Sequence, residues 1–408
     1  MSSNPLSLVL VGIAGWGKRF VSTVLDAPPE RNIRLAGTVD PFPENCRRLD
    51  DLRRLKVPHY STLEEFYQHH HADLAVICSP IQFHADHVCV AVKHGSDALC
   101  EKPLCTTPDD ARRMAEAQRE SGRHVAIGYQ WSFSGAIQEL KTDIMAGRFG
   151  APRRFRSLTL WPRGEAYYGR NNWAGVLRDE GGRPVFDSPV NNACAHSLHN
   201  MLFLLGDRVD AAAWPTHTQA ELFRANAIPS YDTAVLRSQT SAGADILMVV
   251  SHATKTLLGP VFSYEFEDAT VDYFDAPHAI VKATFKSGSS ICYGTPNEPR
   301  DRKFWETIEA IRHKQPPACP IAAAAAHTQA MWDAQNNPNG IVDFPKRMVK
   351  VLGAAPERQT VVQGLEVALQ QCYDSFAMPS ELGFKWAKPA PAPKPLKPVS
   401  RPGRKAVA

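Results

Sequence analysis

The stretch Leu6-Ser7-Leu8-Val9-Leu10-Val11-Gly12-Ile13-Ala14-Gly15-Trp16-Gly17 decides the fold of this chain. Its first half is almost uniformly apolar, as in a strand that is buried on both faces. Its second half is a glycine-rich turn, and residues 18–25 after it read as a helix. A buried strand, a tight glycine turn and a helix form the first unit of a fold that binds dinucleotides.

The glycine turn has the spacing G-x-A-x-x-G. Gly12 permits the turn, the small residue Ala14 lets the backbone approach a pyrophosphate, and Gly17 lets the helix pack closely on the strand. The motif alone is weak evidence, because its second position carries a methyl group. With its context, it predicts that the following loop residues contact the cofactor: Gly12, Ala14, Gly15, Trp16 and Gly17.

An acidic residue ends the next apolar segment, where Asp40 follows residues 33–39 and lies 23 residues after Gly17. In dinucleotide-binding folds an acid near this position accepts hydrogen bonds from the adenosine ribose, and it would repel the 2′-phosphate of NADP. The alternative is that Asp40 only starts the turn with Pro41 and Pro43. The strand and the glycine motif together favour the cofactor role, so we expect NAD rather than NADP.

Apolar and helical segments then alternate. The expected helices cover 44–55, 84–94 and 108–121, and the expected strands cover 73–79, 98–100 and 124–128. Strands joined by helices of this length predict an α/β domain with a parallel, doubly wound sheet, whose ligands bind beyond the carboxyl ends of the strands. At those ends we expect further cofactor contacts from Ser79, Pro80, His84, Glu101, Lys102 and Gln130.

The pattern changes after residue 130. Segments 153–161 and 211–294 hold β-branched and aromatic runs broken by turn residues, which predict a mainly antiparallel sheet with one open face. Segments 320–335 and 359–376 are predicted to be helices that cover it.

The chain therefore divides into three parts. These are a Rossmann domain (1–130), an α+β domain for substrate binding and oligomerisation (131–387), and a disordered basic tail rich in Pro, Ala and Lys (388–408).

Composition limits the function classes. The net charge of +4 depends on six basic residues of the tail, without which 40 basic residues face 42 acidic ones, a charge of −2. A near-neutral body argues against a nucleic-acid surface. The sequence contains no run of 18 or more apolar residues, so no membrane span is predicted. The start of the chain lacks the pattern of a signal peptide. Nine cysteines without a C-x-x-C pair fit a reducing compartment, so we expect a cytoplasmic protein.

A charged strand end stands out in Glu101-Lys102-Pro103. Proline fixes its own φ and restricts the residue before it, so Lys102 can be held rigidly at the rim of the sheet. The alternative is an ordinary surface ion pair before a turn.

A second polar group lies on the predicted helix 190–206. Asn192, His196, His199 and Asn200 follow helical spacing and share one face, opposite a stripe of leucine and methionine. Such a face can simply be solvated. A metal site built on His196 and His199 lacks a credible third ligand, so no metal is expected.

These motifs in this order resemble the glucose-fructose oxidoreductase, inositol dehydrogenase and MocA (Gfo/Idh/MocA) family. The motifs that carry the resemblance are Gly12-x-Ala14-x-x-Gly17, Asp40, Ser79-Pro80 with His84, Glu101-Lys102-Pro103, and His196 ten residues before Gly206. The resemblance implies a Rossmann domain, an open-faced sheet and a homo-oligomer, dimeric or tetrameric. It also implies NAD(P)-dependent hydride transfer at a secondary hydroxyl of a sugar, cyclitol or related polyol.

The resemblance also implies roles for single residues. Lys102 corresponds to the lysine of the family's Glu-Lys-Pro motif, which contacts substrate and assists proton transfer, and His196 corresponds to its catalytic histidine. The family commonly has aspartate four residues before that histidine and often another three after it, where this chain has Asn192 and His199. A neutral amide cannot accept the alcohol proton.

We therefore expect His196 to be the base, Lys102 to stabilise the alkoxide and Asn192 to hydrogen-bond the substrate. Trp161, Trp173 and His199 are the expected substrate contacts. The rings of Trp161 and Trp173 can stack on a sugar or simply cover a loop.

Two other functions remain open at this point. The chain could oxidise a sugar transiently, epimerise or eliminate, and reduce it back with recycled NAD. It could also be a non-catalytic regulatory protein that binds NAD and a sugar, which Asn192 and the basic tail would suit.

Overall fold

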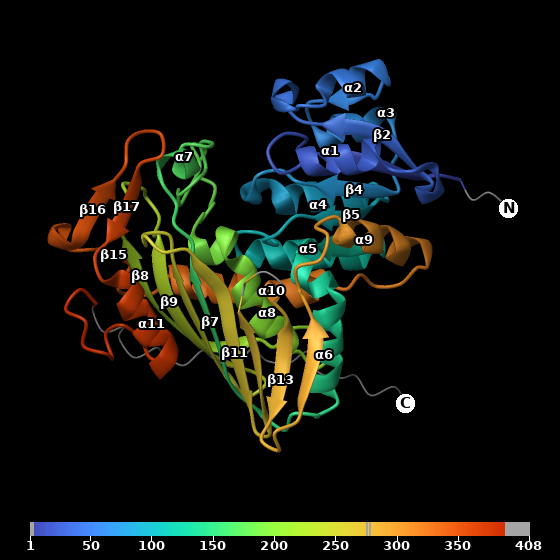
Figure 1. Cartoon of the computed structure of the whole chain (residues 1–408). Helices are drawn as coiled ribbons and strands as arrows, with labels where there is room; N and C mark the ends of the chain where they lie inside the picture. Colours follow the sequence, from blue (N-terminus) through green and yellow to red (C-terminus); the bar gives the residue numbers. More distant parts are fainter. Residues whose placement is uncertain (1–3, 275, 277–278, 388–408) are drawn as a thin grey trace.

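The computed structural model describes residues 4–274, 276 and 279–387, which form two large sheets and one two-stranded sheet (Figure 1). The predicted tail 388–408 lies outside the described residues. A six-stranded sheet in the N-terminal part lies above a nine-stranded sheet, and helices fill the space between them. In the described part of the chain no helix is both long and apolar enough to span a bilayer, and all nine cysteines are free.

The first sheet has the order β3-β2-β1-β4-β5-β6, and all its strands are parallel. Its strands are β1 (Leu6–Val11), β2 (Ile33–Val39), β3 (His59–Tyr60), β4 (Leu74–Ile77), β5 (Asp97–Cys100) and β6 (Val125–Ile127). Its helices are α1 (Lys18–Leu25), α2 (Leu49–Arg54), α3 (Leu63–His69), α4 (His84–Lys93) and α5 (Pro108–Ser121). This order is that of a doubly wound dinucleotide-binding sheet, which confirms the predicted fold class.

The second sheet has the order β14-β13-β12-β11-β7-β10-β9-β8-β15. Its strands are β7 (Pro152–Leu160), β8 (Pro215–Arg224), β9 (Thr233–Thr240), β10 (Asp245–Ser251), β11 (Leu258–Phe266), β12 (Ala269–Phe274), β13 (Val281–Phe285), β14 (Ser290–Gly294) and β15 (Ile341–Asp343). Only the pairs β7/β10 and β8/β15 are parallel among these strands, so the sheet is mainly antiparallel, as predicted.

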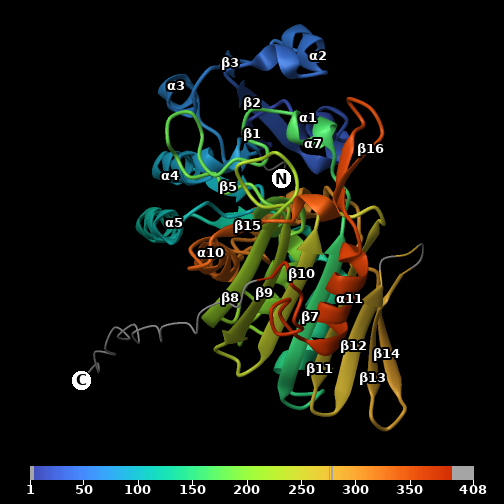
Figure 2. The same cartoon turned by 90° about the vertical axis from the view of Figure 1, so that its left-hand side faces the viewer.

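Helices cover the inner face of this sheet, which looks toward the first one. They are α6 (Gly135–Met145), α8 (Ala195–Leu204) and α10 (Ile321–Gln335). On the outer face, α11 (Leu365–Ser375) lies across β7 and β10 (Figure 2), and its Leu365 and Leu369 are buried in one cluster with Leu158 and Val249.

The outer face is open only in part. Beyond α11 it presents polar residues, such as Asp272 of β12 and Lys282 of β13, which are exposed. The apolar residues of its central strands are covered by α11 and by Trp386 of this same chain. A homo-oligomer therefore stays a prediction without support from this face.

Several elements differ from the sequence prediction. The segment 359–376 is not one helix, because Gln359–Val362 forms β17, paired with β16 (Val349–Leu352), before α11 begins. The expected helix 44–55 starts as a single turn, Pro43–Asn45, and becomes α-helical only in α2. An additional helix, α9 (Arg302–Arg312), was not predicted.

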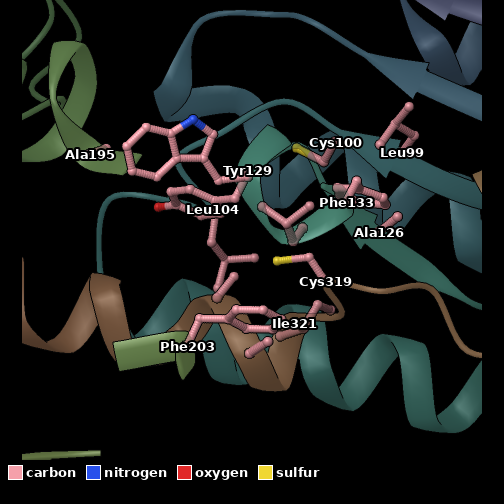
Figure 3. Packing of buried hydrophobic residues seen from close by; sticks show 14 of the residues in the cluster. Leu99, Cys100, Leu104, Ala126, Tyr129, Phe133, Ala195, Phe203, Cys319 and Ile321 are labelled. Carbon is pink, nitrogen blue, oxygen red and sulfur yellow. The ribbon is translucent and has the colours of Figure 1, made fainter. Parts of the chain in front are cut away.

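The later part of the chain returns to the first sheet. The Ile127 amide of β6 donates to the Cys319 carbonyl at 2.8 Å, and Phe304 of α9 contacts Phe20 of α1. Side chains from both parts share one continuous core (Figure 3). The labelled members come from β5 and β6 (Leu99, Cys100, Ala126), from the segments after them (Leu104, Tyr129, Phe133), from α8 (Ala195, Phe203), from the segment before α10 (Cys319) and from the first residue of α10 (Ile321).

Candidate functional site

The glycine loop after β1 is pressed against the end of β4. Gly12 has a φ of +80°, and a Cβ on it would lie 2.8 Å from backbone atoms of Cys78 and Ser79. A Cβ on Gly17 would lie 1.7 Å from the Gly12 carbonyl oxygen. Neither position can carry a side chain without moving backbone, which is the constraint that the sequence motif predicted.

Asp40 follows β2 and is bonded to the glycine loop. Its Oδ2 accepts from the Ile13 amide at 2.9 Å and the Ala14 amide at 3.3 Å. Its Oδ1 accepts from the Phe42 amide at 2.9 Å, so the carboxylate also starts the following turn. The two roles considered for Asp40 are therefore compatible, and its carboxylate lies beside the loop where a ribose-binding acid is expected.

Trp16, in the glycine loop, is hydrogen-bonded to Glu101, the residue that follows β5. Its side chain is 44% exposed, and its indole Nε1 donates to Glu101 Oε1 at 3.0 Å. Glu101 is buried and forms an ion pair with Lys303 of α9, whose Nζ also donates to the Gly128 carbonyl at 3.1 Å. Sequence reasoning missed Lys303, because nothing near Glu101 in the chain indicates a partner 202 residues away.

His84 is not placed to contact a cofactor, which corrects the prediction. It is 1% exposed, and its ring nitrogens lie 2.8 Å from the Pro103 carbonyl oxygen and 3.0 Å from that of Ser79. Burial is the main cause that lowers the pKa of His84, which favours the neutral ring. His84 thus joins the segments after β4 and β5, and so helps to fix the position of Lys102.

The other predicted residues at this edge, Ser79, Pro80 and Gln130, are half-buried. The Ser79 hydroxyl is bonded to His87 Nδ1 at 2.9 Å. Pro80 and Gln130 lie after β4 and β6 as predicted, and contact with a cofactor stays a prediction for all three.

Lys102 belongs to a hydrogen-bonded network that connects the end of β5 to the segment before α8. Its Nζ donates to the Asn192 backbone oxygen at 2.7 Å and to Asn192 Oδ1 at 3.0 Å. Asn192 Nδ2 in turn donates to Asp187 Oδ1 at 2.7 Å. Asp187 is 2% exposed, and its Oδ2 accepts from the Gly175 amide at 2.7 Å and lies 3.7 Å from Arg170.

Asp187 was not predicted from the sequence. It lies just before Ser188, whose side chain accepts from the Asn191 amide at 3.1 Å and so caps the turn that carries Asn192. A search for the N-cap of the predicted helix would have led to this pair.

The predicted helix 190–206 is interrupted. Pro189–Ala193 is a π-helical turn and α8 begins at Ala195, so Asn192 and His196 do not lie on one regular helix. Two residues of the expected polar face, His199 and Asn200, are also buried, whereas Asn192 and His196 are half-buried. Asn200 Nδ2 donates to the Tyr264 hydroxyl at 3.0 Å, within the core.

His199 does not contact a substrate site, in contrast to our prediction. It is 1% exposed, and its ring stacks on Tyr129 with a centroid distance of 3.7 Å. Its Nε2 lies 2.9 Å from the Ser132 hydroxyl. The residue is therefore buried against Tyr129.

Burial shifts the pKa values of Lys102 and His196, although both residues keep some surface exposed. Burial lowers the pKa of Lys102 to about 8. Burial, helped by the charge of Lys102, lowers the pKa of His196 well below its usual value. The Nδ1 atom of His196 has no partner among the described residues. At neutral pH the imidazole is therefore uncharged, and Lys102 is the group that can exchange a proton near neutrality.

The aromatic loop between β7 and α8 lies on the other side of Asp187. Trp161 Nε1 donates to the Gly259 carbonyl at 2.8 Å, so this edge of the indole is already occupied. Trp173 lies under the Arg170 guanidinium, 5.2 Å from ring centroid to Cζ. Arg170 links this loop through Asp187 to Lys102. Stacking of either tryptophan on a substrate stays a prediction.

Two further observations limit the site. Within residues 4–274, 276 and 279–387, no group of three His, Cys, Asp or Glu side chains could hold a metal ion. A cavity lined by Leu6, Asp73, Asp97 and His124 lies where β1, β4, β5 and β6 begin. It is therefore at the opposite edge of the sheet from the glycine loop and Lys102.

Comparisons with known proteins agree with this geometry. Residues 6–129 match a family described as "Oxidoreductase family, NAD-binding Rossmann fold". A 1-carboxy-3-chloro-3,4-dihydroxycyclohexa-1,5-diene dehydrogenase from Comamonas testosteroni is 27% identical over 200 residues, 49% of this chain and 48% of that protein. An inositol 2-dehydrogenase from Pseudomonas savastanoi pv. phaseolicola is 33% identical over 137 residues, 33% of this chain and 36% of that protein.

The chain thus matches half or less of the length of these curated relatives. A solved oxidoreductase from Agrobacterium radiobacter, in complex with NAD+, L-tartaric acid and magnesium, superposes with a TM-score of 0.65 at 18% identity. The superposition covers 81% of this chain and 95% of that one, so both sheets belong to the shared fold.

Proposed function

We propose an activity for the whole chain from the match of residues 6–129 to the Gfo/Idh/MocA family of oxidoreductases with an NAD-binding Rossmann fold. The chain transfers hydride between NAD and a secondary hydroxyl of a sugar, cyclitol or related polyol. The observation that carries this proposal is the placement of Lys102. Its ammonium group lies at the carboxyl end of β5, is bonded to Asn192, and is near enough to His196 to lower its pKa.

The residues around the glycine loop fit a bound NAD, which would supply the hydride acceptor. The backbone from Gly12 to Gly17 can approach a pyrophosphate, and the first turn of α1 holds no acidic residue that would repel it. The Asp40 carboxylate lies beside the loop at the end of β2 and favours NAD over NADP, whose extra phosphate it would repel.

The pKa shifts reverse the roles that the sequence suggested for Lys102 and His196. A general base works best when its pKa lies near the working pH. The pKa of Lys102 is about 8, whereas that of His196 is lowered well below its usual value. Lys102 in its neutral form therefore takes the hydroxyl proton, and His196 stays neutral and hydrogen-bonds the substrate.

Asn192 orients Lys102 rather than replacing the missing aspartate as a base. The Asn192 amide nitrogen donates to Asp187, which fixes the amide oxygen toward the Lys102 ammonium. Two neutral oxygens of Asn192 thus hold Lys102 without the charge of a direct carboxylate partner. This arrangement lets burial lower the pKa of Lys102.

The test is NADH formation from a panel of sugars, cyclitols and polyols by the wild type, Lys102→Met and the surface control Lys93→Met. We expect Lys102→Met to lower kcat by about 100-fold or more, while the NADH dissociation constant stays the same. Lys93 is exposed on α4, and its variant should match the wild type. Equal kcat in wild type and Lys102→Met would overturn the proposal.

A further inference from the structure

Two arginines of the aromatic loop, Arg163 and Arg170, lie over aromatic rings near the hydrogen-bonded network of Lys102. The Arg170 Cζ atom lies 3.7 Å from the centroid of the Tyr167 ring. The Arg163 Cζ atom lies 5.1 Å from the centroid of the same ring and 5.5 Å from that of Trp161. A guanidinium that lies over aromatic rings keeps its N–H groups directed outward in its own plane, where they can bind an anion.

Arg163 has no acidic partner among the described residues. The two nearby carboxylates, Asp187 and Glu165, already face other arginines. Arg170 faces Asp187 at 3.7 Å, and the nearby Glu165 is paired with Arg358 at 3.0 Å. Arg163 donates from Nη1 to the Pro162 carbonyl at 3.1 Å, and its buried Nε has no partner among the described residues. A buried donor without an acceptor is costly, so this side chain is arranged for an acceptor that the chain does not supply.

Arg163 also lies near the reacting end of the site. The Tyr167 ring that lies under Arg163 also carries Arg170, which faces Asp187, the carboxylate that holds Asn192 beside Lys102. The charges of Arg163 and Lys102 both act on the Cys194 thiol, although burial raises the pKa of that thiol to about 12. Cys194 lies between Asn192 and His196 in the chain. One molecule at Lys102 can therefore reach the Arg163 guanidinium as well.

The charges in this part of the site do not balance. Lys102, Arg163 and Arg170 bring three positive charges, and the facing carboxylate is that of Asp187. Lys102 binds neutral oxygens, and Glu101 at the end of β5 is matched by Lys303. The excess of positive charge disfavours a second cation and favours a ligand with negative charge.

We propose that the hydroxylated substrate carries an anionic group, a carboxylate or a phosphate, which the free N–H groups of Arg163 bind while Lys102 handles the reacting hydroxyl. This inference rests on the proposed function, because it places the substrate at Lys102. It narrows the substrate class from neutral sugars and polyols to their acidic derivatives.

The test uses matched sugars that differ only at one carbon: D-glucose, D-glucuronate and D-glucose 6-phosphate, and the same three forms of D-galactose. NADH formation is measured with the wild type, Arg163→Met, Arg163→Lys and the control Arg178→Met. Arg178 is exposed on the same loop and bonds only the Gly182 carbonyl among the described residues.

In the wild type we expect kcat/KM for an anionic member to exceed that of its neutral partner by about 10- to 100-fold, as for a charge-assisted hydrogen bond. Arg163→Met should remove most of this preference by raising KM, and Arg163→Lys should keep part of it. Arg178→Met should keep all of it. Comparison of kcat/KM for the uronate and the 6-phosphate shows whether Arg163 prefers a carboxylate or a phosphate.

Oxidation of the neutral sugars as well as or better than the acidic ones would overturn this inference and leave the proposed function standing. An unchanged preference in Arg163→Met would also overturn it. If neither these sugars nor any member of the sugar, cyclitol and polyol panel is oxidised, the proposed function fails and this inference fails with it.

Discussion

The buried ion pair between Glu101 and Lys303 allows us to predict how much the free energy of unfolding falls when one partner is removed. The Glu101 and Lys303 side chains are 9% and 2% exposed, so the pair has left water almost completely. Replacing Lys303 by Met leaves the carboxylate with two donors, the Trp16 indole at 3.0 Å and the Lys102 amide at 3.2 Å. Removing one partner of a buried pair costs about 3–5 kcal/mol. Because these two donors remain, we expect about 3 kcal/mol.

The assay is denaturant unfolding of the wild type, Lys303→Met, the double variant Glu101→Gln/Lys303→Met and the surface control Lys93→Met. The double variant should recover most of the loss, to within about 1 kcal/mol of the wild type, because a neutral pair of similar volume avoids the cost of a buried charge. Lys93→Met should change little. A loss below about 1 kcal/mol in Lys303→Met, or a double variant no better than the single one, would refute the reasoning.

Two other predictions concern the site. Asp187→Asn leaves one acceptor oxygen for two donors, the Gly175 amide and the Asn192 side chain, so we expect kcat to fall about 10- to 100-fold. The NADH dissociation constant, measured by fluorescence, should stay the same, and an unchanged kcat would show that Asp187 does not position Lys102 through Asn192. Asp40→Ser removes the carboxylate beside the glycine loop, so the dissociation constant of NAD should rise about tenfold and that of NADP should fall. Titration of both cofactors, with the unfolding midpoint as a control for the loop contacts, checks this, and an unchanged ratio of the two constants would contradict the ribose role.

The first sheet could be predicted from the sequence because its signals are local. The strand at Leu6–Val11, the glycine turn and Asp40 lie within 35 residues and define one βα unit and the start of the next. The helix α3 was missed although its signal is local too. Thr62 accepts from the Glu65 amide at 3.2 Å and Glu65 accepts from the Ser61 amide at 3.3 Å, a capping arrangement visible as Thr-x-x-Glu.

The candidate site was predicted less completely, because its decisive contacts are not periodic or not local. Helical spacing placed His199 beside His196, but the π-helical turn before α8 and the stacking on Tyr129 put His199 in the core. Asp187 precedes the predicted helix, and Lys303 lies 202 residues from Glu101. Burial shifts the pKa values of Lys102 and His196. It results from packing between segments far apart in the sequence, so it could not be predicted from either segment alone.

The role of Lys102 is tested most directly by the pH dependence of hydride transfer in a single turnover with saturating NAD. Burial lowers the pKa of Lys102 to about 8. In the proposed mechanism its neutral amine is the base. The rate of alcohol oxidation should therefore rise with pH and level off above about pH 8, and Lys102→Met should lose this rise. A rise with the same midpoint in Lys102→Met, or a wild-type rate that is already constant below about pH 6.5, would contradict the account.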